Sequence, residues 1–332
     1  MPAPSVTVLM ACFNGERWLR EAVASVLDQT LKDFEFLIID DGSVDGSSAI
    51  LAEFARNDGR VRVLTKTNTG LADSLNVGMA AAKGKWIARL DADDVCEPDR
   101  LERQLNHVNE NPGIVFLGSG LIEIDEFGRI VTRHHYPTDH ASLTKALTHR
   151  HKFPPHSSAF FDKAVVISLG GYRPRIRCAE DYDLWLRLSE VGKVASLDRA
   201  LVRIRQHPEQ ISQGATGIQQ QIDARIALVG YWLRKRGAID PISGSDDVFM
   251  RFSHFVSQRV ISSHVIEYAQ YVRRVRVIML SRNASLNFRL GAVSAALSNR
   301  RFLLTFFWMW IFPEKLSARI ADQWSLTSPT SA

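Results

Sequence analysis

The chain has 332 residues, of which 45% are hydrophobic and 23% are charged, a balance typical of a globular protein that can bury a core. Its three cysteines, Cys12, Cys96 and Cys178, are too scattered for a disulfide framework or a cysteine zinc site, so we expect a reducing, cytoplasmic compartment. The net charge of +5 is uneven, because residues 1–213 carry 26 Lys and Arg against 29 Asp and Glu, whereas residues 214–332 carry 15 against 7.

Strand-like and helix-like segments alternate through the first 120 residues. Apolar runs typical of buried strands cover 5–11, 34–40, 61–65, 85–90 and 114–119. Helix patterns follow at 16–29, from about Ser47, at 71–82 and at 98–110. This alternation predicts an α/β, doubly wound fold with a mostly parallel sheet, whose ligands lie outside the carboxyl ends of the strands.

Beyond residue 120 the pattern changes. The segment 122–131, IEIDEFGRIV, resembles a hairpin, 180–192 a helix, and 194–205 short strands. From residue 215 onward the sequence predicts basic helices, followed by a Ser/Thr/Pro-rich tail for which we expect disorder. We therefore predict an α/β domain over 1–213 and a helical extension over 214–332.

Three aspartates, Asp91, Asp93 and Asp94, close the fourth predicted strand in the stretch IARLDADD. Like charges this close repel, and a bound cation is the usual reason to tolerate them. Carboxylates are the ligands that Mg²⁺ and Mn²⁺ prefer, with phosphates of a substrate completing the shell. The cluster therefore predicts a divalent-metal site, with a solvated acidic loop as the alternative.

A second acidic pair, Asp40 and Asp41, ends the second predicted strand in LIIDDGSVDGS. Such a turn is often purely structural, but an aspartate here could accept hydrogen bonds from a nucleotide base or ribose. The first strand is not followed by G-x-G-x-x-G, and no G-x-x-x-x-G-K-[ST] motif occurs, which disfavours dinucleotide enzymes and P-loop NTPases.

Four segments in this order and spacing resemble the inverting family 2 glycosyltransferases with the GT-A fold. They are VTVLMACFNG, LIIDDGSVDGS, NTGLADSLNVGMAAAKGKWIARLDADD and AEDYDLWLRL, and the resemblance covers roughly residues 4–210. The resemblance implies a GT-A fold, a nucleotide-sugar donor that is usually UDP-linked, and a divalent cation.

The resemblance also implies roles for individual residues. Those placed beside the donor nucleotide are Ala11, Phe13 (where the family often has tyrosine), Asn14, Asp40, Asp41, Asn68, Gly70 and Asp91. Those placed at the Mg²⁺ or Mn²⁺ ion are Asp93, Asp91, Asp94 and His207. Asp181 falls where the family has its general base, with Glu180 beside it. His156 is a further candidate for acceptor or donor contact.

These residues also have structural interpretations. Asp181 suits the first turn of a helix, where acidic side chains favour the helix dipole. His156 could be a loop or core histidine, and His207 a surface histidine before a proline. Asn68 and Gly70 could form a plain helix-capping turn.

The implied reaction is a direct displacement at the anomeric carbon of the donor. A carboxylate takes the proton of the acceptor hydroxyl, and the cation stabilises the leaving diphosphate. We expect a saccharide or lipid-linked saccharide as acceptor, in bacterial surface polysaccharide or glycolipid synthesis. Residues 219–225, QQQIDAR, lack the tryptophan of the Q-x-x-R-W motif of processive relatives, which predicts a non-processive enzyme.

Two other functions remain open from the sequence. A nucleotidyltransferase also uses paired aspartates, but it should carry a Gly- and Arg-rich phosphate loop that this chain lacks. A non-catalytic nucleic-acid-binding protein would use the basic residues 214–332. No recognition motif is visible there and residues 1–213 carry net negative charge, so we expect no nucleic-acid partner.

The C-terminal region holds an aromatic and aliphatic run over 302–312, which is too short to span a bilayer. Trp308 and Trp310 favour the headgroup boundary, and the basic residues around the run, together with those of 272–280, would attract anionic lipid. We therefore predict peripheral attachment to the inner face of the cell membrane. Packing within a helical subdomain or a dimer interface is the alternative.

Overall fold

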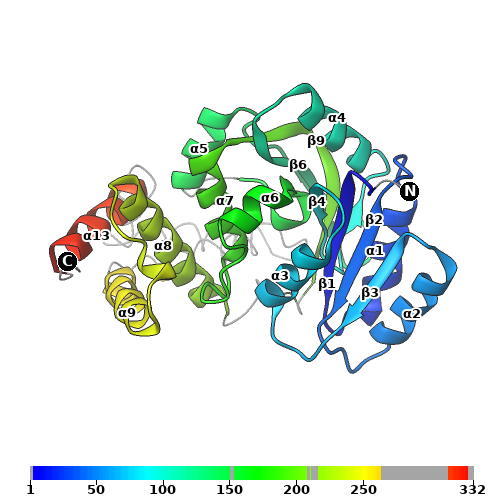
Figure 1. The fold of residues 1–332 in the computed structure, drawn as a ribbon, viewed down its shortest axis with the longest axis horizontal. Coiled ribbons are helices and arrows are strands. Elements are labelled where there is room, and N and C mark those ends of the chain that lie inside the picture. The colour runs from blue at the N-terminus through cyan, green and yellow to red at the C-terminus, as the bar shows by residue number, and fades with distance from the viewer. Residues whose placement is uncertain (1–2, 150–152, 208–209, 211–215, 263–312, 328–332) are drawn as a thin grey trace, which may run out of the picture. The chain divides into compact units, whose positions relative to one another are not determined.

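The chain forms two compact units, Met1–Gln213 and Gly214–Ala332. The computed structural model describes residues 3–149, 153–207, 210, 216–262 and 313–327 (Figure 1). Within these ranges, no helix combines the length and the apolar character that a membrane crossing requires.

In the described part of the first unit, nine strands form one sheet in the order β3-β2-β1-β4-β8-β6-β9-β5, with β7 paired to β6. The strands are β1 (Val6–Cys12), β2 (Glu35–Asp40), β3 (Val61–Thr65), β4 (Trp86–Arg89), β5 (Val95–Cys96), β6 (Ile114–Asp125), β7 (Ile130–His134), β8 (Phe160–Asp162) and β9 (Lys193–Gln206). The helices are α1 (Glu16–Leu27), α2 (Ser47–Asn57), α3 (Leu71–Ala81), α4 (Arg100–Glu110), α5 (His140–Thr148), α6 (Lys163–Ser168) and α7 (Glu180–Val191), with a 3-10 turn η1 (His156–Ser158).

Strands β1 to β4 are parallel and carry the first half of the sheet. The nearly continuous apolar runs of β1 and β2 suit strands that are covered on both faces, and all six residues of β2 are buried. Cys12 pairs with Asp40 at the ends of β1 and β2, so the loops that follow both strands emerge at one edge. The predicted strands 5–11, 34–40, 61–65 and 85–90 agree with β1 to β4 to within about one residue at each end.

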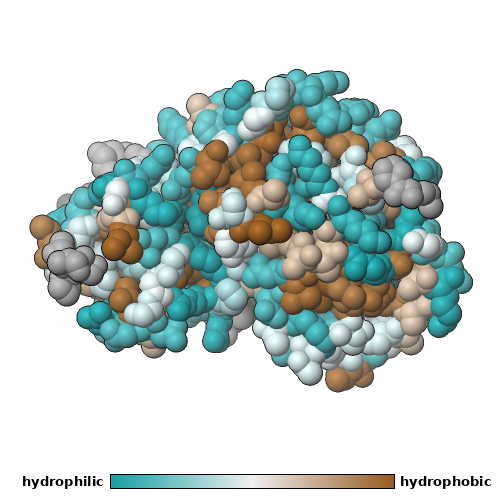
Figure 2. Space-filling view, in the orientation of Figure 1, coloured by the Kyte–Doolittle hydropathy of each residue, from teal (hydrophilic) through white to brown (hydrophobic). Residues whose placement is uncertain are grey.

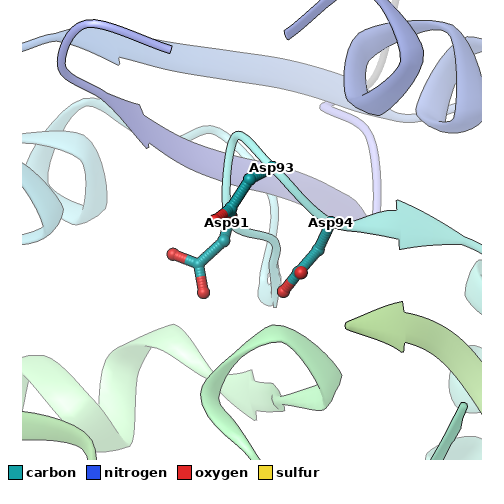
Figure 3. Close-up of side chains that lie close together, drawn as sticks. All are labelled: Asp91, Asp93 and Asp94. Atoms are coloured by element: carbon teal, nitrogen blue, oxygen red, sulfur yellow. The ribbon is translucent and has the colours of Figure 1, made fainter. Parts of the chain in front are cut away.

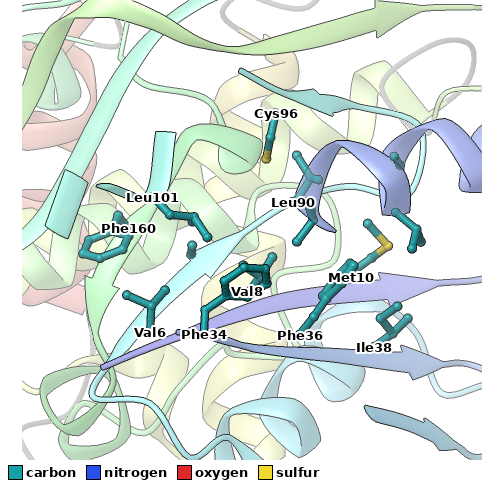
Figure 4. Close-up of a cluster of buried hydrophobic side chains, with 14 of the residues drawn as sticks. Val6, Val8, Met10, Phe34, Phe36, Ile38, Leu90, Cys96, Leu101 and Phe160 are labelled. Carbon is teal, nitrogen blue, oxygen red and sulfur yellow. The ribbon is translucent and has the colours of Figure 1, made fainter. Parts of the chain in front are cut away.

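The two faces of this half are covered by different helices. On one face, β1 and β2 side chains pack with apolar residues of α1 and α4 in the cluster drawn in Figure 4, which includes Met10, Phe36 and Leu101. On the other face α3 packs so closely that a Cβ atom on Gly78 would lie 2.3 Å from a methyl carbon of Leu9. Figure 2 shows hydrophilic residues over most of the drawn face, with apolar residues gathered in patches among them.

The second half of the sheet has mixed pairing. Strand β8 runs antiparallel between β4 and β6, β5 runs antiparallel to β9, and β6 and β7 form the predicted hairpin. Strands β6 and β9 are parallel over most of their length, so the short strands expected near 194–205 are one strand. The predicted α/β fold with helices flanking a central sheet is confirmed.

The described part of the second unit is helical, as expected. Its helices are α8 (Thr216–Lys235), α9 (Asp246–Ser262) and α13 (Pro313–Thr327), with a 3-10 turn η2 (Pro241–Ser243). Trp324 of α13 packs edge-on against Phe252 and Phe255 of α9. The predicted membrane-binding segments 272–280 and 302–312 lie outside the described residues, as do residues 328–332 of the tail for which we expect disorder.

Candidate active site

The turn after β4 brings three carboxyl groups together. One oxygen from each of Asp91, Asp93 and Asp94 lies within 4.8 Å of the others. Figure 3 shows the three side chains leaving a single tight turn toward the same side. The sequence prediction that these residues share one site therefore agrees with the geometry.

The surroundings of the three aspartates disfavour the ionised form of their carboxyl groups. Burial, reinforced by the charges of Asp93 and Asp91, raises the pKa of Asp94 well above its ordinary value. Burial and the charge of Asp91 also raise the pKa of Asp93. Because a divalent cation would relieve this repulsion, and because carboxylate oxygens are hard ligands, these residues fit a site for Mg²⁺ or Mn²⁺.

Arg89 and Ser157 support the cluster from within the protein. The buried guanidinium of Arg89 donates two hydrogen bonds to the carboxylate of Asp91 and a third, of 3.0 Å, to the Ser157 hydroxyl. That hydroxyl lies 2.9 Å from Oδ2 of Asp91 and 2.5 Å from Oδ2 of Asp94, so its one proton is shared between two acceptors. The orientation of Asp91 and Asp94 is thus fixed by residues of β4 and η1.

The end of β9 brings His207 to the cluster from far along the chain. Its Nε2 lies 2.9 Å from Oδ2 of Asp93, and its ring packs against Trp18 with 4.0 Å between centroids. The Nδ1 atom is buried and has no hydrogen-bond partner among the described residues. Two residues earlier, in β9, the backbone N–H of Arg205 donates a hydrogen bond of 3.0 Å to Oδ1 of Asp94. His207 is therefore a buried neighbour of the candidate metal ligands and not a surface residue.

Asp41 lies at the carboxyl end of β2, where the loop before α3 surrounds it. Its oxygens accept hydrogen bonds from Lys66 Nζ at 2.5 Å, the backbone N–H of Thr69 at 3.0 Å and that of Gly70 at 2.9 Å. Burial alone would raise the pKa of Asp41, but these donors lower it below its ordinary value. Gly70 adopts a φ of 95°, which a side chain would disfavour. Asp41 therefore stays ionised and shapes this loop.

Asp40 is fully buried and points into its own turn. Its carboxylate accepts hydrogen bonds from the Ser43 backbone N–H at 3.0 Å and from the Ser48 hydroxyl at 2.5 Å. Asn14, with a φ of 52°, accepts a hydrogen bond of 2.9 Å from the backbone N–H of Val44. Asp40 therefore supports the loop after β2, and Asn14 connects that loop to the one after β1.

The other residues expected beside the nucleotide differ in exposure. Phe13 is half exposed, Asn68 is exposed and Ala11 is partly buried. The Phe13 side chain is thus accessible to a ligand.

Glu180 and Asp181 open α7, where the helix dipole favours negative charge. Burial, reinforced by Asp181, raises the pKa of Glu180 to about 8, and burial also raises the pKa of Asp181. The charges of Arg89 and Asp91 act on both of these pKa values. The acid pair of α7 therefore lies within electrostatic reach of the β4 cluster.

His156 lies in η1 next to Ser157 and is buried. Its Nε2 is 2.7 Å from the hydroxyl of Tyr172, and its Nδ1 is 4.0 Å from Oε1 of Glu180. Burial, followed by the charge of Arg89, lowers the pKa of His156 well below its ordinary value, so the ring is neutral. The geometry matches the core-histidine alternative for His156.

Sequence reasoning missed Arg89, Ser157 and Tyr172. A signal existed for Arg89, because an arginine inside a buried apolar strand must have a partner. Ser157 and Tyr172 had none, since a serine or tyrosine far along the chain says nothing of which strand end it will meet.

Comparisons with known proteins agree with this architecture. Residues 7–170 match the family model described as Glycosyl transferase family 2. The putative glycosyltransferase EpsE of Bacillus subtilis is 35% identical over 212 residues, which cover 61% of this chain and 73% of that protein. The amylovoran biosynthesis glycosyltransferase AmsE of Erwinia amylovora is 31% identical over 211 residues, covering 62% of this chain and 78% of that protein.

Solved structures share the fold at low sequence identity. TarS 1–349 of S. aureus in complex with UDP-GlcNAc has a TM-score of 0.60 and 14% identity, covering 97% of this chain and 92% of that one. The mannosyltransferase PcManGT of Pyrobaculum calidifontis, in complex with GDP-Man and Mn²⁺, has a TM-score of 0.53 and 16% identity, covering 98% and 88%.

Fold, acid cluster and relatives together define a glycosyltransferase with a GT-A-like fold. Within that class, the chain belongs to glycosyl transferase family 2. Membership of this family replaces the two alternatives that the sequence left open, a nucleotidyltransferase and a non-catalytic nucleic-acid-binding protein.

Proposed function

We propose that this glycosyltransferase moves a sugar from a UDP-linked donor to an acceptor hydroxyl, with inversion and with a divalent cation. The observation that carries the proposal is that the turn η1 lies between the two acid groups: Ser157 contacts Asp91 and Asp94, and Nδ1 of the adjacent His156 lies 4.0 Å from Oε1 of Glu180. Donor-side and proton-accepting groups would thus share one site. TarS, whose solved complexes hold UDP and UDP-GlcNAc, supports the choice of nucleotide.

The donor side would be formed by loops at the carboxyl ends of β1, β2 and β4. Asp41, held ionised, would accept hydrogen bonds from the base, and Phe13 would border the nucleotide. Asp93, with Asp91 and Asp94, would hold the cation. A divalent ion there supplies Lewis-acid stabilisation of the charge that grows on the leaving diphosphate.

The acceptor side would be formed by α7. Asp181 would take the proton of the acceptor hydroxyl, and its raised pKa brings it closer to the working pH, where general bases are most effective. Such a base contributes roughly 10²–10⁴-fold to the rate. A single displacement by this hydroxyl inverts the anomeric configuration.

The acceptor would be a saccharide or a lipid-linked saccharide of a bacterial surface polysaccharide or glycolipid. AmsE, which is named for amylovoran biosynthesis, supports the polysaccharide. A lipid-linked acceptor would suit the predicted peripheral attachment to the inner face of the cell membrane.

A donor screen tests the proposal. The purified protein is mixed with Mn²⁺ and a panel of nucleotide sugars, and thermal shift and nucleotide release are recorded. Asp93→Asn should abolish the metal-dependent shift, whereas the control Asp99→Asn, at an exposed surface ion pair before α4, should keep it. Asp181→Asn should bind donor without transfer. Undiminished turnover after chelation of all divalent cations would refute the metal-dependent reaction.

A further inference from the structure

The turn η1 presents two adjacent side chains to the two acid groups. Ser157 contacts Asp91 and Asp94 of the β4 cluster, as described above. His156 faces the other way, toward Glu180 of α7 and the hydroxyl of Tyr172. One short turn therefore supports both the donor side and the base side of the proposed active site.

Tyr172 is held in place by hydrogen bonds from α3. The Asn76 side chain accepts a 2.8 Å hydrogen bond from the Tyr172 backbone N–H and donates another of 2.8 Å to its carbonyl. The preceding Gly171 has a φ of 70°, and a Cβ atom there would lie 2.4 Å from Oδ1 of Asn76. The Tyr172 hydroxyl is thus a fixed reference point beside His156.

We propose that Tyr172 is a positioning residue that holds His156 as the tautomer with its proton on Nδ1, so that this N–H faces Glu180 and orders the acid pair containing the base. The proposal rests on the proposed function, because it assigns Asp181 as the base. The Tyr172 hydroxyl lies 2.7 Å from Nε2, and in the proposed tautomer it donates its proton to that nitrogen. The other tautomer would point the Nδ1 lone pair at Oε1 of Glu180, 4.0 Å away, and would need Glu180 to be the donor.

The surroundings of His156 favour a fixed ring. Trp185 of α7 packs edge-on against it, with 5.8 Å between ring centroids. The charged and titratable groups acting on His156 and Tyr172 are Arg89, Asp91, Glu180, Asp181 and each other. Since the ring is buried and neutral, its tautomer determines whether Nδ1 presents an N–H group or a lone pair to the acid pair.

Tyr172→Phe and Tyr182→Phe form a matched pair of variants. Both tyrosines are buried, and each hydroxyl makes a hydrogen bond of 2.7 Å, but that of Tyr182 goes to the backbone carbonyl of Leu147. We expect Tyr172→Phe to lower kcat about tenfold with donor KM within about twofold, because positioning acts on the transition state. Tyr182→Phe should lower the Tm about as much as Tyr172→Phe does, but it should leave kcat within about twofold of the wild-type value. Equal kcat in both variants would overturn the proposal.

Nitrogen-15 NMR of the imidazole ring gives a test that does not depend on activity. In the wild-type protein, the His156 signals should report a protonated Nδ1 and a bare Nε2, and Tyr172→Phe should shift them while Tyr182→Phe does not. A wild-type ring protonated on Nε2, with Glu180 donating to Nδ1, would refute the proposal even if every variant failed to fold. Absence of sugar transfer by the wild-type protein would instead count against the proposed function.

Discussion

The side chain of Glu180 resists ionisation because it is buried beside Asp181, which raises its pKa to about 8. Between the ordinary carboxyl pKa and about 8, the unfolded chain loses this proton while the folded protein keeps it. The free energy of unfolding should therefore fall as the pH rises through that interval. Glu180→Gln cannot ionise, so we expect its stability relative to the wild-type protein to increase from about pH 5 to about pH 8.

Urea denaturation at several pH values measures this difference. Glu102→Gln on α4, which removes an exposed carboxyl group, serves as the control and should show a flat difference with pH. A flat difference for Glu180→Gln as well would show that Glu180 ionises normally in the folded protein.

Asp41 offers a second prediction for a single residue. Asp41→Asn would weaken the hydrogen bonds from Lys66, Thr69 and Gly70, at a cost of about 1–3 kcal/mol in the free energy of unfolding. If the loop borders the donor, the donor Kd should rise about tenfold, as measured by calorimetry. Asp73→Asn is the matched control, since Asp73 is half exposed and also pairs with Lys66, at 3.3 Å. Equal effects of the two substitutions would contradict a special role for Asp41.

The residue types predicted the acid cluster but not the residues that contact it from other parts of the chain. Three aspartates at a strand end are informative because burying their charge requires a reason, and the structure brings them together. The partner of Asp93, His207, could be named only from the family resemblance, since it comes from the far end of β9. Ser157 reaches the cluster through tertiary packing, which no local pattern records.

Among the elements, long apolar strands were predictable and short ones were not. Strands β1, β2 and β4 are almost wholly buried, so their apolar composition identifies them, and the edge strand β3 is recognisable from its alternating pattern. Strand β8 has three residues, and its antiparallel place between β4 and β6 depends on partners distant in sequence. The second half of β6 and the continuity of β9 likewise come from their mutual pairing.

Arg100 joins the elements that carry the site. Its buried guanidinium donates to the carbonyl of Arg89 at 2.8 Å, to that of Ala159 at 3.1 Å and to the Gln104 side chain at 3.0 Å. Arg100→Met would remove these three buried hydrogen bonds, so we expect a loss of about 3 kcal/mol in the free energy of unfolding. Chemical denaturation measures it.

Arg103, one turn along α4, is the natural control for Arg100. It forms an exposed ion pair with Asp99, so Arg103→Met should cost less than about 1 kcal/mol. Similar losses at the two positions would mean that Arg100 does not hold the end of β4 in place.

At the scale of the whole molecule, the two units differ in net charge. Residues 214–332 carry a net charge of +8 and residues 1–213 a net charge of −3. Basic residues near an anionic lipid surface contribute about 1 kcal/mol each, and the attraction decays over a Debye length. We therefore expect the protein to sediment with vesicles rich in phosphatidylglycerol and much less with phosphatidylcholine vesicles.

Salt dependence and substitutions test where this attraction originates. Raising the salt from about 0.1 M to about 1 M shortens the Debye length from about 10 Å to about 3 Å, so anionic-vesicle binding should fall at least about tenfold. Arg300→Gln with Arg301→Gln should weaken binding at low salt. The charge-matched pair Arg56→Gln and Arg103→Gln, both exposed in the first unit, should not. Equal weakening by both pairs, or binding that salt does not change, would rule out a basic C-terminal surface as the attachment site.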